Sequence, residues 1–263
     1  MKIGFIGVGV MAGAMLRAAL DAGFLKPADV IVYDKFPPAP EKFPGVTIAA
    51  SAKELAAACD ILQLGVKPQD LPALLEDISP ALRPGCLVIS IAAGVPLAKI
   101  TPYAPKAVRL MPNINATVGQ AMTAYCAADT VDGDELDFIK GYCECFGRAI
   151  ALEEKHFSAF VALAGSAPAF VYLFIDELAR AGVAAGLPKA QALAIAAQTA
   201  FGSAALVQQS GLHPYELIDR VCSPGGTTIA GVNKLREHGF AHAVSQAALA
   251  AYNRDRELSM HNA

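Results

Sequence analysis

The segment Ser223-Pro224-Gly225-Gly226-Thr227-Thr228 combines residue types that suit the binding of an anion. The proline restrains the backbone, and the two glycines allow a sharp turn or a close approach to a ligand. Apolar residues then recur at helical spacing (Ile229, Val232 and Leu235), which predicts a helix that starts at the two threonines. The first N–H groups of a helix lack intrahelical partners and can hold a carboxylate or a phosphate. A plain, well-capped helix start is the alternative, and the segment alone does not separate the two.

A glycine-rich turn stands at the other end of the chain. Residues 3–8 predict a strand that runs through Gly7-x-Gly9-x-x-Ala12 into a helix. The first glycine permits the tight turn, the second lets a pyrophosphate approach the backbone, and the small alanine allows close packing of helix on sheet. The pattern predicts a dinucleotide site whose residues are Gly7, Gly9, Val10, Met11 and Ala12.

Asp34 follows the second predicted strand, 22 residues after Ala12 (34 − 12). A carboxylate there would accept hydrogen bonds from both ribose hydroxyls of NAD and would repel a 2′-phosphate. Lys35 would partly offset that repulsion, so the pair favours NADH over NADPH only moderately. The alternative is that Asp34 is a solvated turn residue.

Three further loops, at residues 66–68, 92–94 and 112–113, follow predicted strands. Open α/β sheets bind their ligands at these ends of their strands. Lys67 is expected to serve as a cation near the phosphates or as a surface lysine at a helix start. Asn113 is expected to bind the nicotinamide amide or to cap a turn. The candidate cofactor residues in these loops are Val66, Lys67, Pro68, Ala92, Ala93, Gly94, Pro112 and Asn113.

The first half of the chain alternates short apolar runs with amphipathic ones, which predicts a parallel, doubly wound sheet. We assign residues 1–152 to this Rossmann-type, dinucleotide-binding domain of an α/β fold. The predicted strands are Ile3–Val8, Val30–Tyr33, Ile61–Leu64, Leu87–Ile91, Ala107–Met111 and Met122–Cys126, with a closing strand at Ala149–Leu152. The predicted helices between them are Met11–Ala22, Ala52–Ala58, Gln69–Leu82 and Asp134–Phe146.

Strand signals end near Glu153, and residues 153–263 predict an all-helical domain for substrate binding and dimerisation. The predicted helices are Glu154–Leu163, Ala167–Ala185, Lys189–Gln209, Tyr215–Val221, Thr228–Glu237 and Ala241–Met260. Several of them are apolar around their whole circumference and therefore need partners on every side. We expect a homodimer through these faces.

The composition and the net charge argue against several classes of protein. Of the 263 residues, 54% are hydrophobic and 17% are charged, and the net charge of −3 gives no long-range attraction to nucleic acid. The apolar window Ala190–Val207 contains Gln191, Gln198, Thr199 and Ser203, from which we predict that it does not span a membrane. The six cysteines lack metal-ligand or disulfide spacing, so we expect reduced thiols, no metal and a cytoplasmic protein.

Taken together, these motifs resemble pyrroline-5-carboxylate reductase. The shared motifs are Gly-x-Gly-x-Met-Ala, Val66-Lys67-Pro68, the 90–94 stretch, Met111-Pro112-Asn113, Gly165-Ser166-Ala167-Pro168-Ala169-Phe170 and, most specifically, residues 223–228. The sequence departs from the family's usual pattern at Val10, Ala167, Ile114-Asn115 and Asp34. The change at Ile114-Asn115 bears on the ring size of the substrate. Asp34 stands where many members have a small polar residue and prefer NADPH.

The resemblance implies reduction of the cyclic imine 1-pyrroline-5-carboxylate to L-proline by NAD(P)H, the last step of proline biosynthesis. The substrate carboxylate would bind at Ser223, Gly225, Gly226, Thr227 and Thr228. Thr228 would contact the imine nitrogen as the catalytic residue. A ring of dimers is compatible with the family.

Two other functions remain open from the residues. A reductase of a related imine or a β-hydroxyacid dehydrogenase shares this domain order, and the latter needs a positioned lysine, for which Lys189 and Lys234 are available. The other alternative is a nucleotide sensor without turnover.

Overall fold

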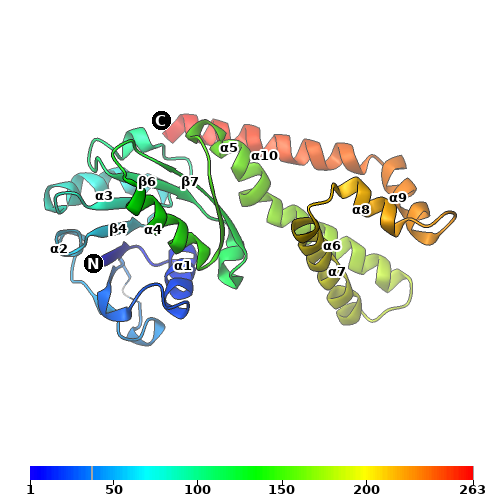
Figure 1. The fold of residues 1–263 in the computed structure, drawn as a ribbon, viewed down its shortest axis with the longest axis horizontal. Coiled ribbons are helices and arrows are strands. Elements are labelled where there is room, and N and C mark those ends of the chain that lie inside the picture. The colour runs from blue at the N-terminus through cyan, green and yellow to red at the C-terminus, as the bar shows by residue number, and fades with distance from the viewer. Residues whose placement is uncertain (37, 263) are drawn as a thin grey trace. The chain divides into compact units, whose positions relative to one another are not determined.

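The computed structural model describes residues 1–36 and 38–262. These residues form two compact units, which we describe separately. The first consists of Met1–Gly165 together with Ala251–Ala263, and the second of Ser166–Ala250 (Figure 1).

The first unit is built on one sheet with the strand order β3-β2-β1-β4-β5-β6-β7-β8. Its strands are β1 (Ile3–Ile6), β2 (Val30–Tyr33), β3 (Thr47–Ile48), β4 (Ile61–Leu64), β5 (Leu87–Ser90), β6 (Ala107–Met111), β7 (Ala121–Ala127) and β8 (Gly147–Ala151). β1 pairs in parallel with both β2 and β4, so the order of winding reverses at β1. That reversal creates the switch point at which doubly wound sheets bind ligands.

The prediction of a wholly parallel sheet was wrong at one pair, because β7 runs antiparallel to β6. A parallel return needs a crossover of a dozen or more residues. Here only residues 112–120 connect the two strands, and they include a 3-10 turn at Ile114–Val118. The chain therefore turns back directly, and β8 runs parallel to β7, so both of these strands run opposite to β6.

Helices cover both faces of the sheet. On one face, α1 (Val10–Asp21) and α4 (Gly133–Glu144) share a core cluster with Phe5 and Ile89. On the other, α2 (Ala52–Ala58) and α3 (Leu71–Ile78) share a cluster with Leu62 and Val88. This arrangement leaves the carboxyl ends of the strands as the edge where loops can meet a ligand.

The sequence placed most of these elements within a few residues. The strands predicted at Val30–Tyr33, Ile61–Leu64 and Ala107–Met111 have those bounds in the structure. The short strand β3 was missed, because two exposed residues at the sheet edge show no alternation. The helix predicted over Gln69–Leu82 is divided into a 3-10 turn, α3 and a second 3-10 turn.

We predicted a domain boundary after residue 152, but neither compact unit begins or ends at that residue. The first unit continues through α5 (Phe157–Phe160) to Gly165 and takes in residues 251–263. Phe157 and Phe160 account for the continuation, because they pack with Ala124 of β7 in a cluster of their own. The predicted helix Glu154–Leu163 is likewise divided, into a 3-10 turn, α5 and a π-helix over Val161–Ser166.

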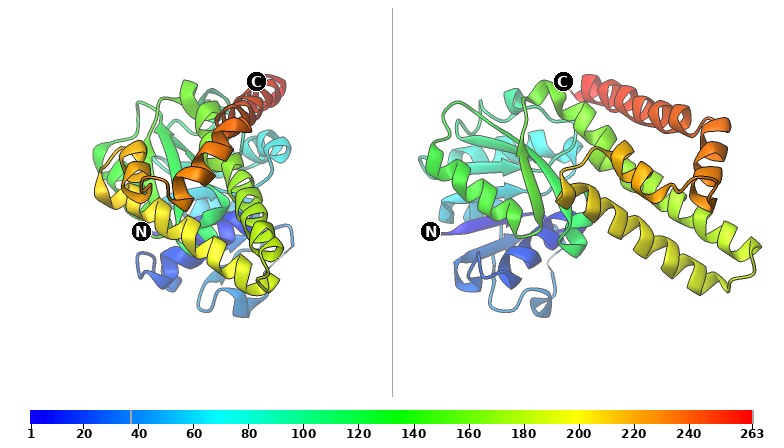
Figure 2. Two further views of the ribbon diagram at one scale, coloured as in Figure 1. Left: turned by 90° about the vertical axis from the view of Figure 1, so that its right-hand side faces the viewer. Right: turned by 45° about the vertical axis from the view of Figure 1, so that its right-hand side comes forward.

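The second unit is helical, as predicted. It contains α6 (Ala167–Ala184), α7 (Lys189–Ser210), α8 (Pro214–Val221), α9 (Thr227–Glu237) and the first part of α10 (Phe240–Asn262). α6 and α7 lie side by side (Figures 1 and 2), joined by a cluster of small residues at Ala179, Ala192 and Ala196. Their other faces expose large apolar side chains, including Leu173 (62%), Ile195 (56%) and Phe201 (61%).

Two helical segments of the described chain are long and apolar enough to cross a membrane, judged by length and composition alone. They are Glu154–Ala184 and Lys189–Ser210, and little of either is buried. The second segment contains the window Ala190–Val207, and our prediction that this window does not span a membrane stays a prediction. The many alanines and other apolar residues of the segment keep its mean hydropathy high despite its polar side chains.

The cysteines behave as small apolar residues. All six are free thiols, and Cys59, Cys86 and Cys143 are buried. Burial raises the pKa of Cys59 to about 11 and that of Cys143 to about 12, so both stay protonated at neutral pH. Within the described part of the chain, no cluster of three or more His, Cys, Asp or Glu side chains is placed to hold a metal ion.

Candidate cofactor and substrate sites

The glycine turn lies at the switch point of the sheet. Gly7 follows β1 with a φ of +85°, and a Cβ there would lie 2.8 Å from the carbonyl oxygen of Gly65. Gly65 follows β4, and its own Cβ would lie 2.4 Å from the carbonyl oxygen of Gly7. The two backbones therefore approach too closely for a side chain on either residue. Our sequence-based predictions missed that position 65 must also be a glycine.

The start of α1 is open beyond this turn. Gly9 is the N-cap of α1 with a φ of −62°, and, apart from its chain neighbours and its own helix, no described residue has an atom within 4 Å of a Cβ built on it. Val10 beside it is 75% exposed, whereas Ala12 is buried against the sheet. The space and the N-terminal N–H groups of a 12-residue helix suit a pyrophosphate, as the motif predicted.

Asp34 binds the glycine turn directly. Its Oδ2 accepts a hydrogen bond from the backbone N–H of Val8 at 2.7 Å, and its Oδ1 accepts one from Phe36 at 3.1 Å. Asp34 is thus a turn residue that also stabilises the glycine turn after β1. Each carboxylate oxygen has a further lone pair, so a ribose hydroxyl can still bind there.

Lys42 is a cation at this site that no sequence motif indicated. It ends the 3-10 turn Pro40–Lys42, and its Nζ donates to the carbonyl of Val8 at 3.2 Å. Its Nζ also lies 5.3 Å from the ring centroid of Phe43, within cation–π range. The local pattern could not predict this contact, because the lysine reaches the glycine turn across 34 residues of sequence.

The loops after β4 and β5 lie at the same edge of the sheet as Gly7. Lys67 is exposed and precedes the 3-10 turn at Pro68–Asp70, while Val66 packs against the core. After β5, Ala92 and Gly94 are buried and Ala93 is exposed. Gly94 has a φ of +72°, so the turn needs a glycine.

The side chain of Asn113 makes two hydrogen bonds to the backbone of the first unit. Its side-chain amide donates to the carbonyl of Ala164 at 2.9 Å, and its Oδ1 accepts from the N–H of Met122 at 3.3 Å. With 6% of its surface exposed, it lies among the buried polar residues beside buried Pro112. The side chain makes no capping hydrogen bond to the turn at Ile114–Val118, so the turn cap that we gave as the alternative is not observed, and the contact with nicotinamide stays a prediction.

In the second unit, residues 223–228 form the helix start that their sequence predicted. Gly225 has a φ of +67°, Gly226 is the N-cap of α9, and the helix begins at Thr227. A Cβ on Gly226 would lie 2.3 Å from the hydroxyl oxygen of Ser223. No side chain of the described residues caps this helix, so its first N–H groups are available to an anion.

Comparisons with known proteins agree with this arrangement. The sequence profile for pyrroline-5-carboxylate reductase dimerisation matches residues 154–258, and that for NADP oxidoreductase, coenzyme F420-dependent, matches residues 2–94. Pyrroline-5-carboxylate reductases from Escherichia coli (strain K12) and Glycine max are each 39% identical to the chain. The alignments cover 98% of the chain and 98% and 96% of those proteins, respectively.

A solved structure extends the likeness to the fold. Plasmodium falciparum pyrroline carboxylate reductase with NADP bound superposes with a TM-score of 0.88 at 30% identity, covering 98% of each chain. Relatives at this identity over the whole length establish common descent of both units. The chain belongs to the pyrroline-5-carboxylate reductase family.

Proposed function

We propose that the chain reduces 1-pyrroline-5-carboxylate to L-proline with NADH or NADPH, as the last step of proline biosynthesis. The observation that carries the proposal is the start of α9, where Thr227 and Thr228 present N–H groups that no described side chain caps, while the N–H of Gly226 donates to the carbonyl of Ser223 at 3.0 Å. A helix N-terminus favours an anion, and the substrate carries one carboxylate.

The cofactor requirement is met by the first unit. Gly7 and Gly65 permit the close turn, and the space at Gly9 leaves room for a pyrophosphate at the start of α1. When bound, the reduced nicotinamide supplies the hydride. The chain's own task is to bind and orient both molecules, which can contribute much of the rate when the reacting atoms are aligned.

The chemistry at the substrate needs little acid–base help from the protein. A protonated imine is already electrophilic, and addition of hydride to its carbon leaves the nitrogen as a secondary amine. We assign the nitrogen contact to the hydroxyl of Thr228 and the carboxylate to Ser223, Gly225 and the N–H groups of Thr227 and Thr228. Gly226 shapes the turn, because its N–H donates to the carbonyl of Ser223. Thr228 is half-buried at the helix start, beside the glycine turn.

The preference between NADH and NADPH follows from Asp34 in our proposal. Its carboxylate lies beside the glycine loop and would repel a 2′-phosphate, which favours NADH. Lys35 and Lys42 reduce this effect, because Lys35 is adjacent and Lys42 contacts the carbonyl of Val8. We therefore expect both cofactors to be used, with NADH preferred moderately.

We infer that the exposed apolar faces of α6 and α7 form a homodimer interface. Membrane insertion would also cover such faces, but the matched profile describes dimerisation and spans both helices. A ring of dimers, a cytoplasmic location and the absence of nucleic-acid or membrane partners remain our predictions. The free cysteines are compatible with a reducing compartment.

Steady-state rates with five- and six-membered cyclic imino acids, each with NADH and with NADPH, test the function. We expect the five-membered imine to have the higher kcat/KM. A higher kcat/KM for the six-membered ring would assign the chain to the related imine. If no imine supports oxidation of either cofactor, the activity proposed here is wrong.

A further inference from the structure

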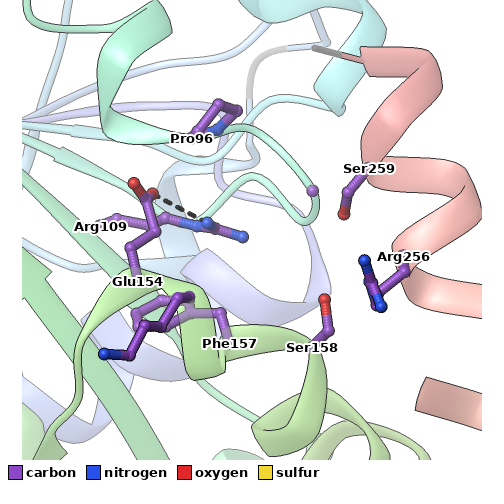
Figure 3. Close-up of a pocket in the computed structure, with 9 residues that line it drawn as sticks. Pro96, Arg109, Glu154, Phe157, Ser158, Arg256 and Ser259 are labelled. Atoms are coloured by element: carbon purple, nitrogen blue, oxygen red, sulfur yellow. Dashed lines mark hydrogen bonds and ion pairs between the residues drawn. The ribbon is translucent and has the colours of Figure 1, made fainter. Parts of the chain in front are cut away.

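A cavity of about 390 Å³ lies in the first unit (Figure 3). Its lining comes from four parts of the chain: the loop after β5, strand β6, residues 154–158 at the start of α5, and the last part of α10. The residues that matter for its chemistry are Arg109, Ser158, Arg256 and Ser259, with Gly94 at its edge.

Arg109 is the unusual member of this lining. Its side chain is 7% exposed, and its Nη1 donates to Oε1 of Glu154 at 2.9 Å. Its guanidinium carbon lies 4.5 Å from the ring centroid of Phe157, which fixes the plane of the group. No acceptor among the described residues binds its buried Nε.

Glu154 satisfies only part of this buried cation. Its Oε1 also accepts a hydrogen bond from the N–H of Leu97 at 2.8 Å, so one carboxylate oxygen serves two donors. A buried charge is costly unless it is paired and hydrogen-bonded. The Nε of Arg109 is enclosed by the protein, so the part of its guanidinium that can meet a ligand in the cavity is its outer end (Figure 3).

The other side of the cavity supplies complementary groups. Figure 3 shows the guanidinium of Arg109 directed into the space that Arg256 and the hydroxyls of Ser158 and Ser259 also face. Lys155 lines the cavity too, although its Nζ pairs with Glu153 at 2.6 Å. Among the described lining residues, three cationic side chains stand against the single carboxylate of Glu154, which leaves the lining net positive.

We propose that this cavity binds a small metabolite through an oxyanion group, either a carboxylate or a phosphate. Two guanidinium groups can hold such a group in charge-assisted hydrogen bonds, and the two hydroxyls can donate to its remaining lone pairs. The volume accommodates a small metabolite but not a dinucleotide. The proposal goes beyond the proposed function, since Arg109, Ser158, Arg256 and Ser259 have no role in it; the cavity shares only the backbone of Gly94 with the candidate cofactor residues.

Calorimetric titration of the intact oligomer tests the proposal. The probes are inorganic phosphate and succinate, each compared with chloride at equal ionic strength, and they distinguish a tetrahedral from a planar oxyanion. We expect saturable binding of at least one. Arg256→Gln should weaken it about ten-fold or more, while Arg254→Gln, an exposed neighbour paired with Glu257, should leave it unchanged.

Two further measurements separate anion binding in this cavity from nonspecific charge effects and from binding at the cofactor site. Arg109→Lys keeps a cation opposite Glu154 but removes the planar guanidinium fork, so it should weaken anion binding while the protein stays folded by circular dichroism. Saturating NADH should leave the affinity for the anion unchanged. The proposal is overturned if neither phosphate nor succinate binds more tightly than chloride. It is also overturned if the Arg256 and Arg254 variants lose the same affinity for the anion, or if NADH competes with the anion.

Discussion

The side-chain amide of Asn113 donates a hydrogen bond to the carbonyl of Ala164, four residues before Pro168. A proline has no N–H to return to the carbonyl four residues earlier in a helix. The chain accommodates Pro168 with a π-helix over Val161–Ser166, and Asn113 supplies the hydrogen bond from the β6–β7 connection. This contact ties the first helical turns after β8 to the sheet.

Replacing Asn113 by alanine should therefore destabilise the fold. The change leaves the carbonyl of Ala164 and the N–H of Met122 without their partner, at a cost of about 1–3 kcal/mol for an unsatisfied buried group. Urea unfolding measures the loss. Asn115→Ala on the same turn is the control and should cost less. An unaltered unfolding midpoint with a raised KM for cofactor would instead support the contact with nicotinamide.

Alanine at Gly7 and at Gly9 should have different effects. At Gly7 the positive φ and the 2.8 Å approach to Gly65 oppose any Cβ, so Gly7→Ala should lower both stability and cofactor affinity. At Gly9 the backbone tolerates a side chain and the space is open, so Gly9→Ala should fold normally. It should nevertheless bind NADH about ten-fold or more weakly, because the methyl group occupies the seat of the pyrophosphate.

Thermal unfolding and fluorescence titration with NADH distinguish these two variants. If Gly9→Ala has the same affinity for NADH as the parent chain, the pyrophosphate does not approach this residue.

Asp34→Asn should shift the cofactor preference towards NADPH. The amide oxygen can still accept the hydrogen bond from Val8, so the turn is kept while the charge is lost. Removal of a repulsion of roughly 1–2 kcal/mol corresponds to a rise of about ten-fold in the ratio of kcat/KM for NADPH to that for NADH. Lys35→Gln should move this ratio in the opposite direction. If both variants keep the parent ratio, Asp34 serves only the turn.

Thr228→Val should impair the reduction without affecting cofactor binding. The substitution keeps the volume and the backbone N–H but removes the hydroxyl assigned to the imine nitrogen. Loss of one hydrogen bond to a charged group predicts a fall in kcat/KM for the imine of about 10- to 100-fold. Thr227→Val is the matched control, and a larger loss there would transfer the role to Thr227. Parent-like turnover in both variants would remove the threonines from the mechanism.

A charge on the outer face of α7 should weaken the oligomer. Phe201 is 61% exposed in the single chain, so Phe201→Glu places a carboxylate in the proposed interface. Light scattering after gel filtration should show a lower mass at micromolar concentration, whereas exposed Gln209→Glu should not change the mass. Recovery of the parent chain only with detergent or lipid would instead support membrane insertion of Glu154–Ala184 and Lys189–Ser210.

Features that depend on neighbours along the chain could be predicted from the sequence. The glycine turn at residues 7–12, Asp34 at the end of β2 and the start of α9 at Thr227 lie where their patterns predicted. Each follows from backbone geometry or spacing within a few residues. The apolar helices of the second unit were predictable for the same reason, because periodicity is a local property.

Features that join distant segments depend on how the folded elements pack together. The antiparallel direction of β7, the use of Asn113 by Ala164 and the approach of Gly65 to Gly7 each depend on which strands and turns meet. The same holds for Arg109 and Arg256, which line one cavity from β6 and α10. Such contacts are set by packing of whole elements, and no local pattern of residues specifies them.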